Sequence, residues 1–360
     1  MNSRPRRIGI GPLVILVIAC GCGKSDPGEG LRKIRALVND PKKPPAIAAV
    51  GEPGHEKVSI VMLEGTKVSD ADLEGIADQV TITNLYLGDT QVGDAGVHTL
   101  RGLFNLQWLD LKHTKVTDRA LPDLAGMARL DKLYLDDDPI TDEGLASLSG
   151  LINLTVLHLA NTKVEGPGLR HLAGLKRLAG LALSGTKVDD RSLVHLAPLS
   201  QLLVLRLDRT RVTDAGLAAL APLERLISLN LDDTKVNGSW LSGAVHAGRI
   251  QVLSLSGTSI DNENAKGLAG LSSIRSLWLN RTAINDEGLA SLEGLKELRE
   301  LGLGGTKITD RSLKRLGNLM MLRDLDLTDT LTTPAGVEAL AKKLPDLKIR
   351  SSTPKPEAKR

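Results

Sequence analysis

Aromatic side chains are scarce in this chain. Among its 360 residues there are three Trp, two Tyr and one Phe. A compact globular core usually takes much of its volume from such rings, so a core of that kind is not expected here. The sequence instead predicts an aliphatic core, of the kind that stacked lanes of leucine form in a solenoid.

Cysteine is limited to Cys20 and Cys22, near the beginning of the chain. Beyond them, a disulfide, a thiolate metal site and a cysteine nucleophile are excluded. The chain also has no large excess of positive or negative charge, because 46 Lys and Arg nearly balance 43 Asp and Glu, which leaves a net charge of +3. No overall field attracts a polyanion, and we expect no nucleic-acid partner.

The sequence also lacks a hydrophobic run long enough to cross a bilayer as a helix. The apolar stretch at residues 8–19 is too short for this. Arg4, Arg6 and Arg7 precede it, and a basic region followed by a short apolar one is typical of a secretory signal peptide.

The apolar stretch ends in Val-Ile-Ala-Cys at residues 17–20, which resembles the signal of bacterial lipoproteins. The resemblance implies a signal peptide at 1–20, export across the inner membrane and a lipid on Cys20. That lipid would anchor the protein to the cell envelope, facing the periplasm or the surface. An ordinary signal peptide with incidental cysteines is the alternative.

What the chain does contain is one pattern repeated every 24 residues, in twelve copies that cover residues 58–345. The first half of each copy reads L-x-x-L-x-L, which predicts a short strand with one buried face. The second half reads T-D-x-G-L-x-x-L-x-x-L, which predicts a short helix. Strands that always run in the same direction stack into a parallel sheet, so the sequence predicts a single α/β solenoid.

The full pattern, L-x-x-L-x-L-x-x-T-x-V-T-D-x-G-L, resembles the leucine-rich-repeat family. It is similar to the subclass known from F-box adaptor proteins and, in architecture, to the ribonuclease-inhibitor-like horseshoe. The resemblance implies an arc with the parallel sheet on its concave face and short helices on its convex face. Residues 21–57 are then a tether and N-terminal cap, residues 346–350 a partial terminal strand and residues 351–360 a disordered tail.

Two positions of the repeat carry polar residues with structural roles. The thirteenth is Asp in eight copies, and we expect each Asp to cap the helix of its own copy. The ninth is Thr in eleven copies, and we expect its hydroxyl to bond to the backbone of neighbouring turns. Asp138 replaces this Thr in one copy, and because an unpaired buried carboxylate is costly, we expect that turn to open to solvent.

Binding residues are expected where the repeat leaves the side chain free. The third and fifth positions point out of the sheet onto the concave face, and they hold four of the six aromatic residues. Exposed rings among charged groups are common binding anchors. The predicted patch consists of Tyr86, Trp108, Asp110, Lys132, Tyr134 and His158. A second, weaker patch consists of Arg206, Arg275 and Trp278. The alternative is that these rings merely cover one another.

Other sites are less favoured. The tenth position is Lys or Arg in seven copies, which could follow a polyanion, but we interpret it as a solvated rim neutralised by neighbouring Asp. Residues Asp136, Asp137 and Asp138, beside Asp89 and Asp110, could hold a weakly bound Ca²⁺; we predict no metal site and no cofactor. The seven histidines are scattered, no phosphate loop follows a strand, and we expect no catalytic residue.

Three functional hypotheses remain. The favoured one is a non-catalytic scaffold that binds a protein or peptide on its concave face, as a monomer anchored by lipid at the cell envelope. A glycan-binding envelope protein that stacks sugars on the concave rings is the first alternative. An intracellular adaptor of the F-box kind is the second. We also expect weaker packing around Gly238, Gly243, Ala244 and Ala265, where the convex apolar stripe is lost.

Overall fold

The computed structural model describes residues 47–50, 57–243 and 248–352. The predicted signal peptide, Cys20 and almost all of the predicted tail lie outside these residues, as does Ala244. Within the described part, no helix is both long enough and apolar enough to cross a membrane.

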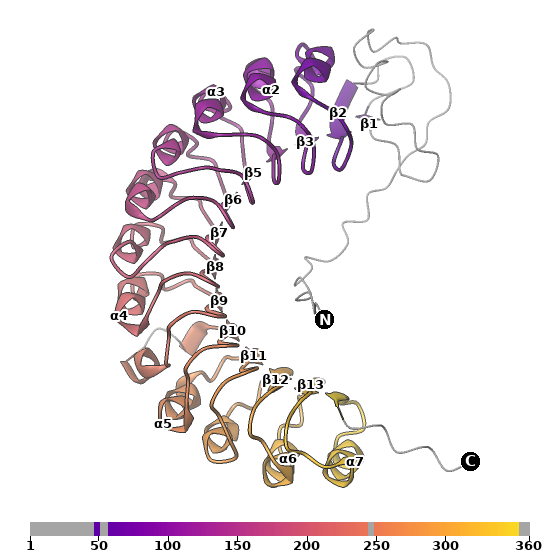
Figure 1. Cartoon of the computed structure of the whole chain (residues 1–360), viewed down its shortest axis with the longest axis vertical. Coiled ribbons are helices and arrows are strands. Elements are labelled where there is room, and N and C mark those ends of the chain that lie inside the picture. Colours follow the sequence, from indigo (N-terminus) through magenta and orange to yellow (C-terminus); the bar gives the residue numbers. More distant parts are fainter. Residues whose placement is uncertain (1–46, 51–56, 244–247, 353–360) are drawn as a thin grey trace, which may run out of the picture.

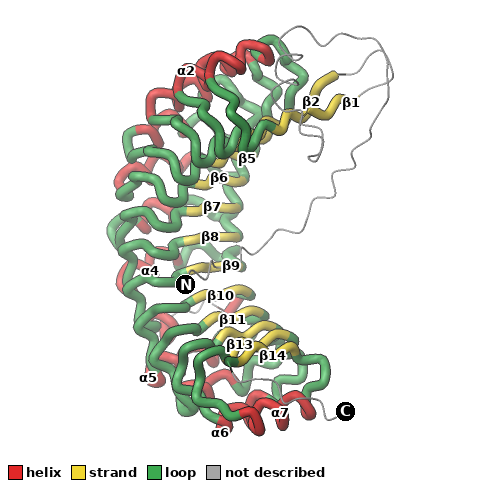
Figure 2. Tube along the Cα trace, turned by 45° about the vertical axis from the view of Figure 1, so that its right-hand side comes forward, coloured by secondary structure: helices red, strands yellow, loops and turns green. Residues whose placement is uncertain are grey.

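The molecule is an open arc with its strands on the inner side and its helices on the outer side (Figure 1). One sheet of 14 strands follows the chain order without a crossover. Residues that pair across neighbouring strands lie one repeat apart, as Leu85, Leu109 and Leu133 do. The predicted solenoid with a concave parallel sheet is therefore confirmed, and Figure 2 shows the strands stacked along the inner surface.

The strands are short because, in most copies, only the third to fifth positions are extended, which places one buried leucine between two concave residues. Their bounds are β1 (Ile47–Val50), β2 (Lys57–Met62), β3 (Asn84–Tyr86), β4 (Trp108–Asp110), β5 (Lys132–Tyr134), β6 (Val156–His158), β7 (Gly180–Ala182), β8 (Val204–Arg206), β9 (Ser228–Asn230), β10 (Val252–Ser254), β11 (Ser276–Trp278), β12 (Glu300–Gly302), β13 (Asp324–Leu327) and β14 (Lys348–Ser351). All neighbouring strands are parallel except β1, which pairs antiparallel to β2.

The convex side is covered by short helices, many of them 3₁₀ helices. The α-helices are α2 (Asp94–Thr99), α3 (Leu121–Leu124), α4 (Asp214–Leu217), α5 (Asn262–Ala265), α6 (Asp310–Leu316) and α7 (Pro334–Lys343). The 3₁₀ helices are η1 (Asp70–Ile76), η2 (Leu100–Gly102), η3 (Asp118–Ala120), η4 (Gly144–Leu148), η5 (Pro167–Gly174), η6 (Leu193–Leu196), η7 (Ala218–Leu220), η8 (Ser239–Gly243), η10 (Lys266–Gly270) and η11 (Gly288–Leu292). Few residues are available in each copy to reach the next strand, and the tighter 3₁₀ form covers more length per residue.

The core lies between these two layers and is aliphatic, as predicted. In the copy at residues 202–225, Leu202, Leu205, Leu207 and Val212 have no exposed surface. Full burial of such a side chain stabilises the fold by about 1.5–3 kcal/mol. Because the same positions are buried in every copy, the leucine lanes are continuous along the arc.

The threonine ladder differs from our expectation in its hydrogen-bond partner. In ten copies the Thr hydroxyl donates to the carbonyl three residues earlier in the same turn, as Thr90 Oγ1 does to Leu87 at 2.6 Å. It does not reach into a neighbouring turn, because the chain bends back so sharply that its own carbonyl is nearer. The ladder therefore fixes the turn inside each copy.

The eighth position, just before the Thr or Asp138, adopts a left-handed backbone conformation in all twelve copies, with φ between +53° and +71°. Four of these residues are glycine. The other eight are Asp89, His113, Asp137, Asn161, Arg209, Asp233, Arg281 and Asp329. Left-handed backbone costs a non-glycine residue roughly 1–2 kcal/mol. The turn is therefore maintained by the rest of the fold at these eight positions in spite of that cost.

The thirteenth-position carboxylates do not cap the helices of their own copies, which corrects that expectation. Each one reaches forward to the following copy, as Asp94 does when it accepts bonds from Thr117 N and Thr117 Oγ1, both at 2.7 Å. All eight Asp and Asn262 accept a backbone amide from the next copy in this way. We call this set of bonds the capping ladder, because it joins nine copies to the copies that follow them, near a helix N-terminus.

Packing is slightly looser near the middle of the arc. Leu220, Leu226 and Leu241 are 8%, 6% and 6% exposed, whereas the corresponding leucines of earlier copies have essentially no exposed surface. Gly238 interrupts the repeat here and has a positive φ of 92°. Burial is thus slightly lower around Gly238 and Gly243 in the described residues of this region, which we call the seam (residues 217–243). Ala265, where we also expected weaker packing, is fully buried.

Candidate functional site

Four rings on four successive strands form one continuous ladder on the concave face. Tyr86 on β3 lies 5.5 Å from Trp108 on β4, between ring centroids, and Trp108 stacks on Tyr134 of β5 at 5.3 Å. The Tyr134 ring meets His158 of β6 edge-on at 4.6 Å. We call these four residues the aromatic ladder. Its members are those that the sequence predicted to lie together.

The strand geometry places the rings on this surface. Side chains alternate along a strand. In β3 and β5 the central leucine is buried, and the tyrosine that follows it, Tyr86 or Tyr134, is partly exposed. Parallel pairing without a shift then sets Tyr86 beside Asp110 and Tyr134 beside His158. The ladder therefore follows from the repeat length together with the choice of residue at two positions.

A cation lies over Trp108, the second ring of the ladder. The Lys132 ammonium is 4.4 Å from the centroid of Trp108, within the range in which a cation is attracted to the ring face. The indole Nε1 of Trp108 is buried and has no hydrogen-bond partner among the described residues. Trp108 is thus held by its ring contacts rather than by its polar atom.

Asp110, which we predicted as a concave binding residue, is 6% exposed and already partnered. Lys112 donates to it twice, from its backbone N to Oδ1 at 3.0 Å and from Nζ to Oδ2 at 3.2 Å. Burial raises the pKa of Asp110, and the charge and hydrogen bonds of Lys112 oppose that rise. Lys112 also pairs with Glu64 at 2.7 Å, so the accessible charges at this end belong to Glu64 and Lys112.

His158 ends the ladder beside a second carboxylate. Its Nδ1 lies 3.2 Å from Asp136 Oδ2, and Asp136 Oδ1 accepts from the backbone N of Ala160 at 2.7 Å. Burial raises the pKa of Tyr134 to about 12, with the charge of Asp110 as the next cause. Tyr134 therefore keeps its hydroxyl proton at neutral pH and remains able to donate a hydrogen bond to a ligand.

Glu64, Lys112 and Asp136 were not in the predicted patch, although the sequence contains a signal for them. All three occupy the seventh position, two residues after the fifth, where the alternation of the strand continues onto the same face. The strands that precede these residues end at the fifth position, so the concave lane continues two residues beyond the regular sheet.

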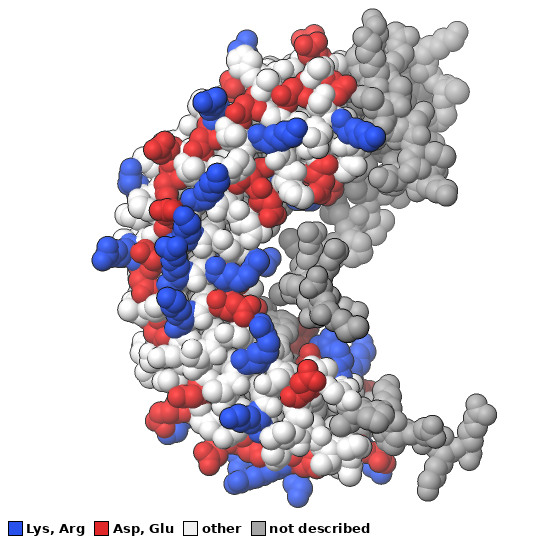
Figure 3. Space-filling model, in the orientation of Figure 1, with Lys and Arg blue, Asp and Glu red and all other residues white. Residues whose placement is uncertain are grey.

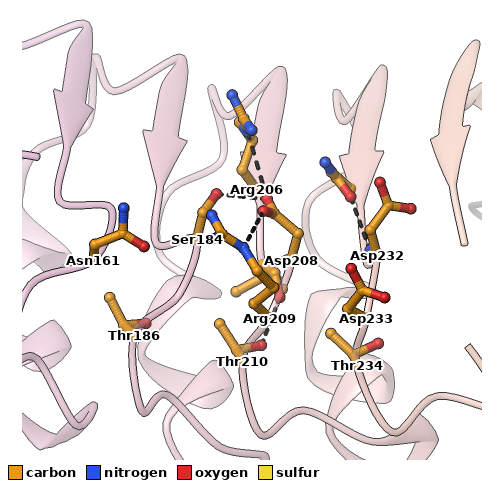
Figure 4. Close-up of polar contacts among 12 residues, drawn as sticks. Asn161, Ser184, Thr186, Arg206, Asp208, Arg209, Thr210, Asp232, Asp233 and Thr234 are labelled. Carbon is orange, nitrogen blue, oxygen red and sulfur yellow. Dashed lines mark hydrogen bonds and ion pairs between the residues drawn. The ribbon is translucent and has the colours of Figure 1, made fainter. Parts of the chain in front are cut away.

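The second predicted patch is not assembled into one surface. Arg206 lies on β8 and Trp278 on β11, with β9 and β10 between them. Arg206 instead turns to Asp208, where Nε is 3.6 Å from Oδ1, and Arg209 approaches the other oxygen of the same carboxylate at 3.4 Å (Figure 4). Arg275 precedes β11, and Trp278 lies against Gly302, where an added Cβ would be 2.7 Å from the ring.

Asp138 does not open to solvent, which corrects our expectation for this turn, although Asp137 beside it is exposed. Asp138 is 1% exposed, and its Oδ1 accepts from Thr114 N at 2.8 Å and from Thr114 Oγ1 at 3.2 Å. Its Oδ2 is buried without a partner among the described residues. Burial raises the pKa of Asp138 to about 7, although the two bonds from Thr114 oppose the rise.

The three neighbouring carboxylates point to different partners. Asp137 accepts from Asn161 at 2.8 Å, Asp136 bonds to Ala160, and Asp138 turns inward. Across the described ranges, no group of three or more His, Cys, Asp or Glu side chains is placed to hold a metal ion. This segment therefore offers no convergent oxygen cage of the kind that Ca²⁺ takes.

Comparison with known proteins gives results only at the level of structure. No family model matches the sequence, and no curated protein matches it. An internalin (inlF) from Listeria monocytogenes superposes with a TM-score of 0.62 at 21% identity, covering 83% of this chain and 87% of the internalin. An LRR protein from Leptospira interrogans gives a TM-score of 0.59 at 20% identity, covering 77% of this chain and 74% of its own.

A third similar structure is that of PEPR1-AtPEP1, with a TM-score of 0.52 at 17% identity. It is matched over 86% of this chain, which spans 50% of the length of that protein. At these identities the likeness concerns the fold alone.

Proposed function

We propose, from the premise that this chain is a leucine-rich-repeat solenoid, that it is a non-catalytic scaffold that binds a protein or peptide on its concave face. The observation that carries the proposal is the aromatic ladder, four rings in unbroken contact on a surface that does not need them for its core. Rings and adjacent charges are the groups that dominate the binding energy of protein interfaces.

The way the rings face one another supports a polypeptide ligand over a sugar. A sugar ring stacks on an open aromatic face, but the Trp108 face is shared with Tyr134 at an interplanar angle of 21° and with the Lys132 ammonium. What the ladder offers to a ligand is ring edges, the Tyr134 hydroxyl and the charges of Lys132, Lys112 and Glu64. Extended polypeptide can satisfy such a mixture with alternating side chains and backbone groups.

Affinity capture with the protein that carries Tyr86→Ala, Trp108→Ala and Tyr134→Ala tests this proposal. We expect it to lose the partners that the unmodified protein recovers. Trp278→Ala is the matched control, because it removes a concave ring that lies outside the ladder. Lys132→Glu keeps all the rings and should weaken capture as well. Equal recovery of the same partners by the triple variant would overturn the proposal.

A concave glycan site is the second candidate, supported by the same partly exposed rings. A glycan array on which Trp108→Ala abolishes binding, while capture recovers no protein, would establish it in place of the polypeptide ligand.

We further propose that the protein is attached to a bacterial cell envelope by a lipid on Cys20. The proposal rests on the sequence at residues 4–20, which lies outside the described residues. Labelling with palmitate should depend on Cys20 and persist in Cys22→Ala. Absence of label in cells that produce the full chain would reject the anchor and favour an intracellular adaptor.

A further inference from the structure

A row of basic side chains runs along one lateral face of the arc, outside the concave surface. Figure 3 shows it as a column of Lys and Arg in the middle of the molecule. The tenth position of four successive copies supplies Lys163, Lys187, Arg211 and Lys235, and all four side chains are exposed. We call these four residues the basic row.

The spacing of the basic row is set by the backbone. The amide of each member donates to a carbonyl of the preceding copy, from Lys187 to Val164 at 3.0 Å, from Arg211 to Val188 at 2.9 Å and from Lys235 to Val212 at 3.3 Å. Adjacent chains joined in this way lie about 4.8 Å apart. The row therefore presents one positive charge for each step of that length.

Three of the four members of the basic row form no ion pair with an acidic side chain among the described residues, so the neighbouring Asp that we expected to neutralise the row are not paired with it. Lys187 pairs with Glu165 at 2.7 Å, and no other member of the row has an acidic partner within the described ranges. Among the nearby aspartates, Asp190 accepts hydrogen bonds from Thr213 N and Oγ1 in the capping ladder and forms no ion pair with the row. Like charges held in one row repel one another, and an anionic ligand would relieve that repulsion.

A cavity of about 280 Å³ opens beside the row, between Lys187 and Arg211. Arg191 and His195 also line it, together with the acidic side chains of Glu165 and Asp189. It lies where Gly166 and Pro167 replace the usual residues at the start of the helical half of a copy. Neither Arg191 nor Arg211 has a side-chain partner in the part of the chain that the structure describes, so both are available to an anionic substituent.

From these observations we infer that the basic row binds a linear acidic polysaccharide that runs along the arc, with one carboxylate over each copy. The single file of cations fits a thin chain, and an extended pyranose residue is close in length to one repeat step. Single-stranded nucleic acid would be expected to meet rings interleaved with the cations, and the row contains none. A flat anionic membrane would meet a broad basic face rather than a line of single charges.

Binding of polygalacturonate, measured by biolayer interferometry at low and at physiological salt, tests the inference. The test variant carries Lys163→Gln, Lys187→Gln, Arg211→Gln and Lys235→Gln. The control variant carries Lys67→Gln, Lys115→Gln, Lys307→Gln and Lys266→Gln, which remove the same charge from positions that are not contiguous. We expect the test variant to bind roughly tenfold more weakly or worse, the control to stay within about twofold, and salt to weaken binding by the unmodified protein.

Three outcomes would overturn the inference. One is that polygalacturonate does not bind, and another is that the test and control variants lose affinity equally. The third is that an oligothymidylate or phosphatidylserine vesicles bind more tightly than polygalacturonate at the same salt. The variant that lacks Tyr86, Trp108 and Tyr134 should bind polygalacturonate normally. A failure of polygalacturonate binding therefore leaves the proposed concave site untouched, and a failure of affinity capture leaves the basic row untouched.

Discussion

At the scale of single residues, Asp138 is the clearest departure from the repeat. It stands where eleven copies have Thr, and one of its oxygens is buried without a hydrogen-bond partner in the described part of the chain. A Thr at this position would donate to the carbonyl of Leu135, as its counterparts do in their own turns. An unsatisfied buried polar group costs about 1–3 kcal/mol, and the cost grows when the group is ionised.

Asp138 should make the stability of the protein depend on pH. Burial raises its pKa in the folded state to about 7, from an ordinary value of 3.8. Because the folded state holds the proton more tightly, its contribution to stability is complete below about pH 4 and is lost as the pH rises through about 7. We expect the free energy of unfolding to fall by an amount on the order of 2–4 kcal/mol between pH 5 and pH 8. The melting temperature should fall over the same range.

The variants Asp138→Thr and Asp138→Asn isolate this effect from other titrating groups. Both remove the ionisable group, and Asn also keeps its shape. The difference in melting temperature between variant and unmodified protein should therefore be small at pH 5 and large at pH 8. A difference that is the same at both pH values would show that Asp138 does not titrate in this range.

At the scale of the element, the capping ladder explains why glycine follows the T-D pair. The Asp118 carboxylate accepts from Thr141 N at 2.9 Å and Thr141 Oγ1 at 2.6 Å, and it lies directly over Gly144. A Cβ added at Gly144 would overlap that carboxylate. The two residues lie in neighbouring copies and are matched in shape, because the carboxylate of Asp118 occupies the space that a side chain at Gly144 would need.

Asp118→Ala and Gly144→Ala should therefore couple in a double-mutant cycle. Alone, the first should destabilise by about 1–2 kcal/mol through the lost caps, and the second by about 1–3 kcal/mol through overlap. Together they should cost about 1 kcal/mol less than their sum, because the alanine at 118 makes room. Chemical denaturation measures all three values.

Gly150→Ala is the control for this cycle, because a Cβ there meets no atom within 4 Å. It should leave stability unchanged or raise it slightly. Strict additivity of the Asp118 and Gly144 effects would contradict the proposed overlap.

These elements also show how far the sequence can be taken. The leucine lanes and the four rings of the aromatic ladder were predicted, because a period of 24 residues and the alternation of a strand determine which side chains lie together. The copy that each Asp caps was predicted wrongly, since identical copies give the same pattern whether a bond closes within one copy or reaches the next. Left-handed turn residues such as Arg209 were missed for a related reason, because side-chain identity at that position varies while the backbone does not.

At the scale of the whole molecule, the seam divides the arc into two unequal parts. A repeat protein gains its stability from contacts between neighbouring copies, so a poorly packed interface is where cooperativity is weakest. Leu226 is 6% exposed, whereas Leu130, at the same position of an earlier copy, has no exposed surface. The two parts joined at the seam should be able to open separately.

Native-state hydrogen exchange should reveal this division. We expect backbone amides in residues 217–243 to exchange with an opening free energy roughly 1–2 kcal/mol lower than those in residues 106–201. Leu130→Ala should accordingly cost more than Leu226→Ala, within the range of about 2–5 kcal/mol for such truncations. Uniform protection across the arc would mean that the exposed leucines do not weaken the interface.

The capping ladder gives the arc a direction. Each carboxylate reaches forward, from Asp94 to Thr117 and from Asp286 to Thr309, so a copy supplies the cap and the next one receives it. A chain that leaves the ribosome N-terminus first has its caps in place before the helices that need them are made. A shortened protein would feel the same asymmetry: cutting copies from the end leaves a carboxylate in water at little cost, whereas cutting them from the beginning leaves bare amides at a helix start.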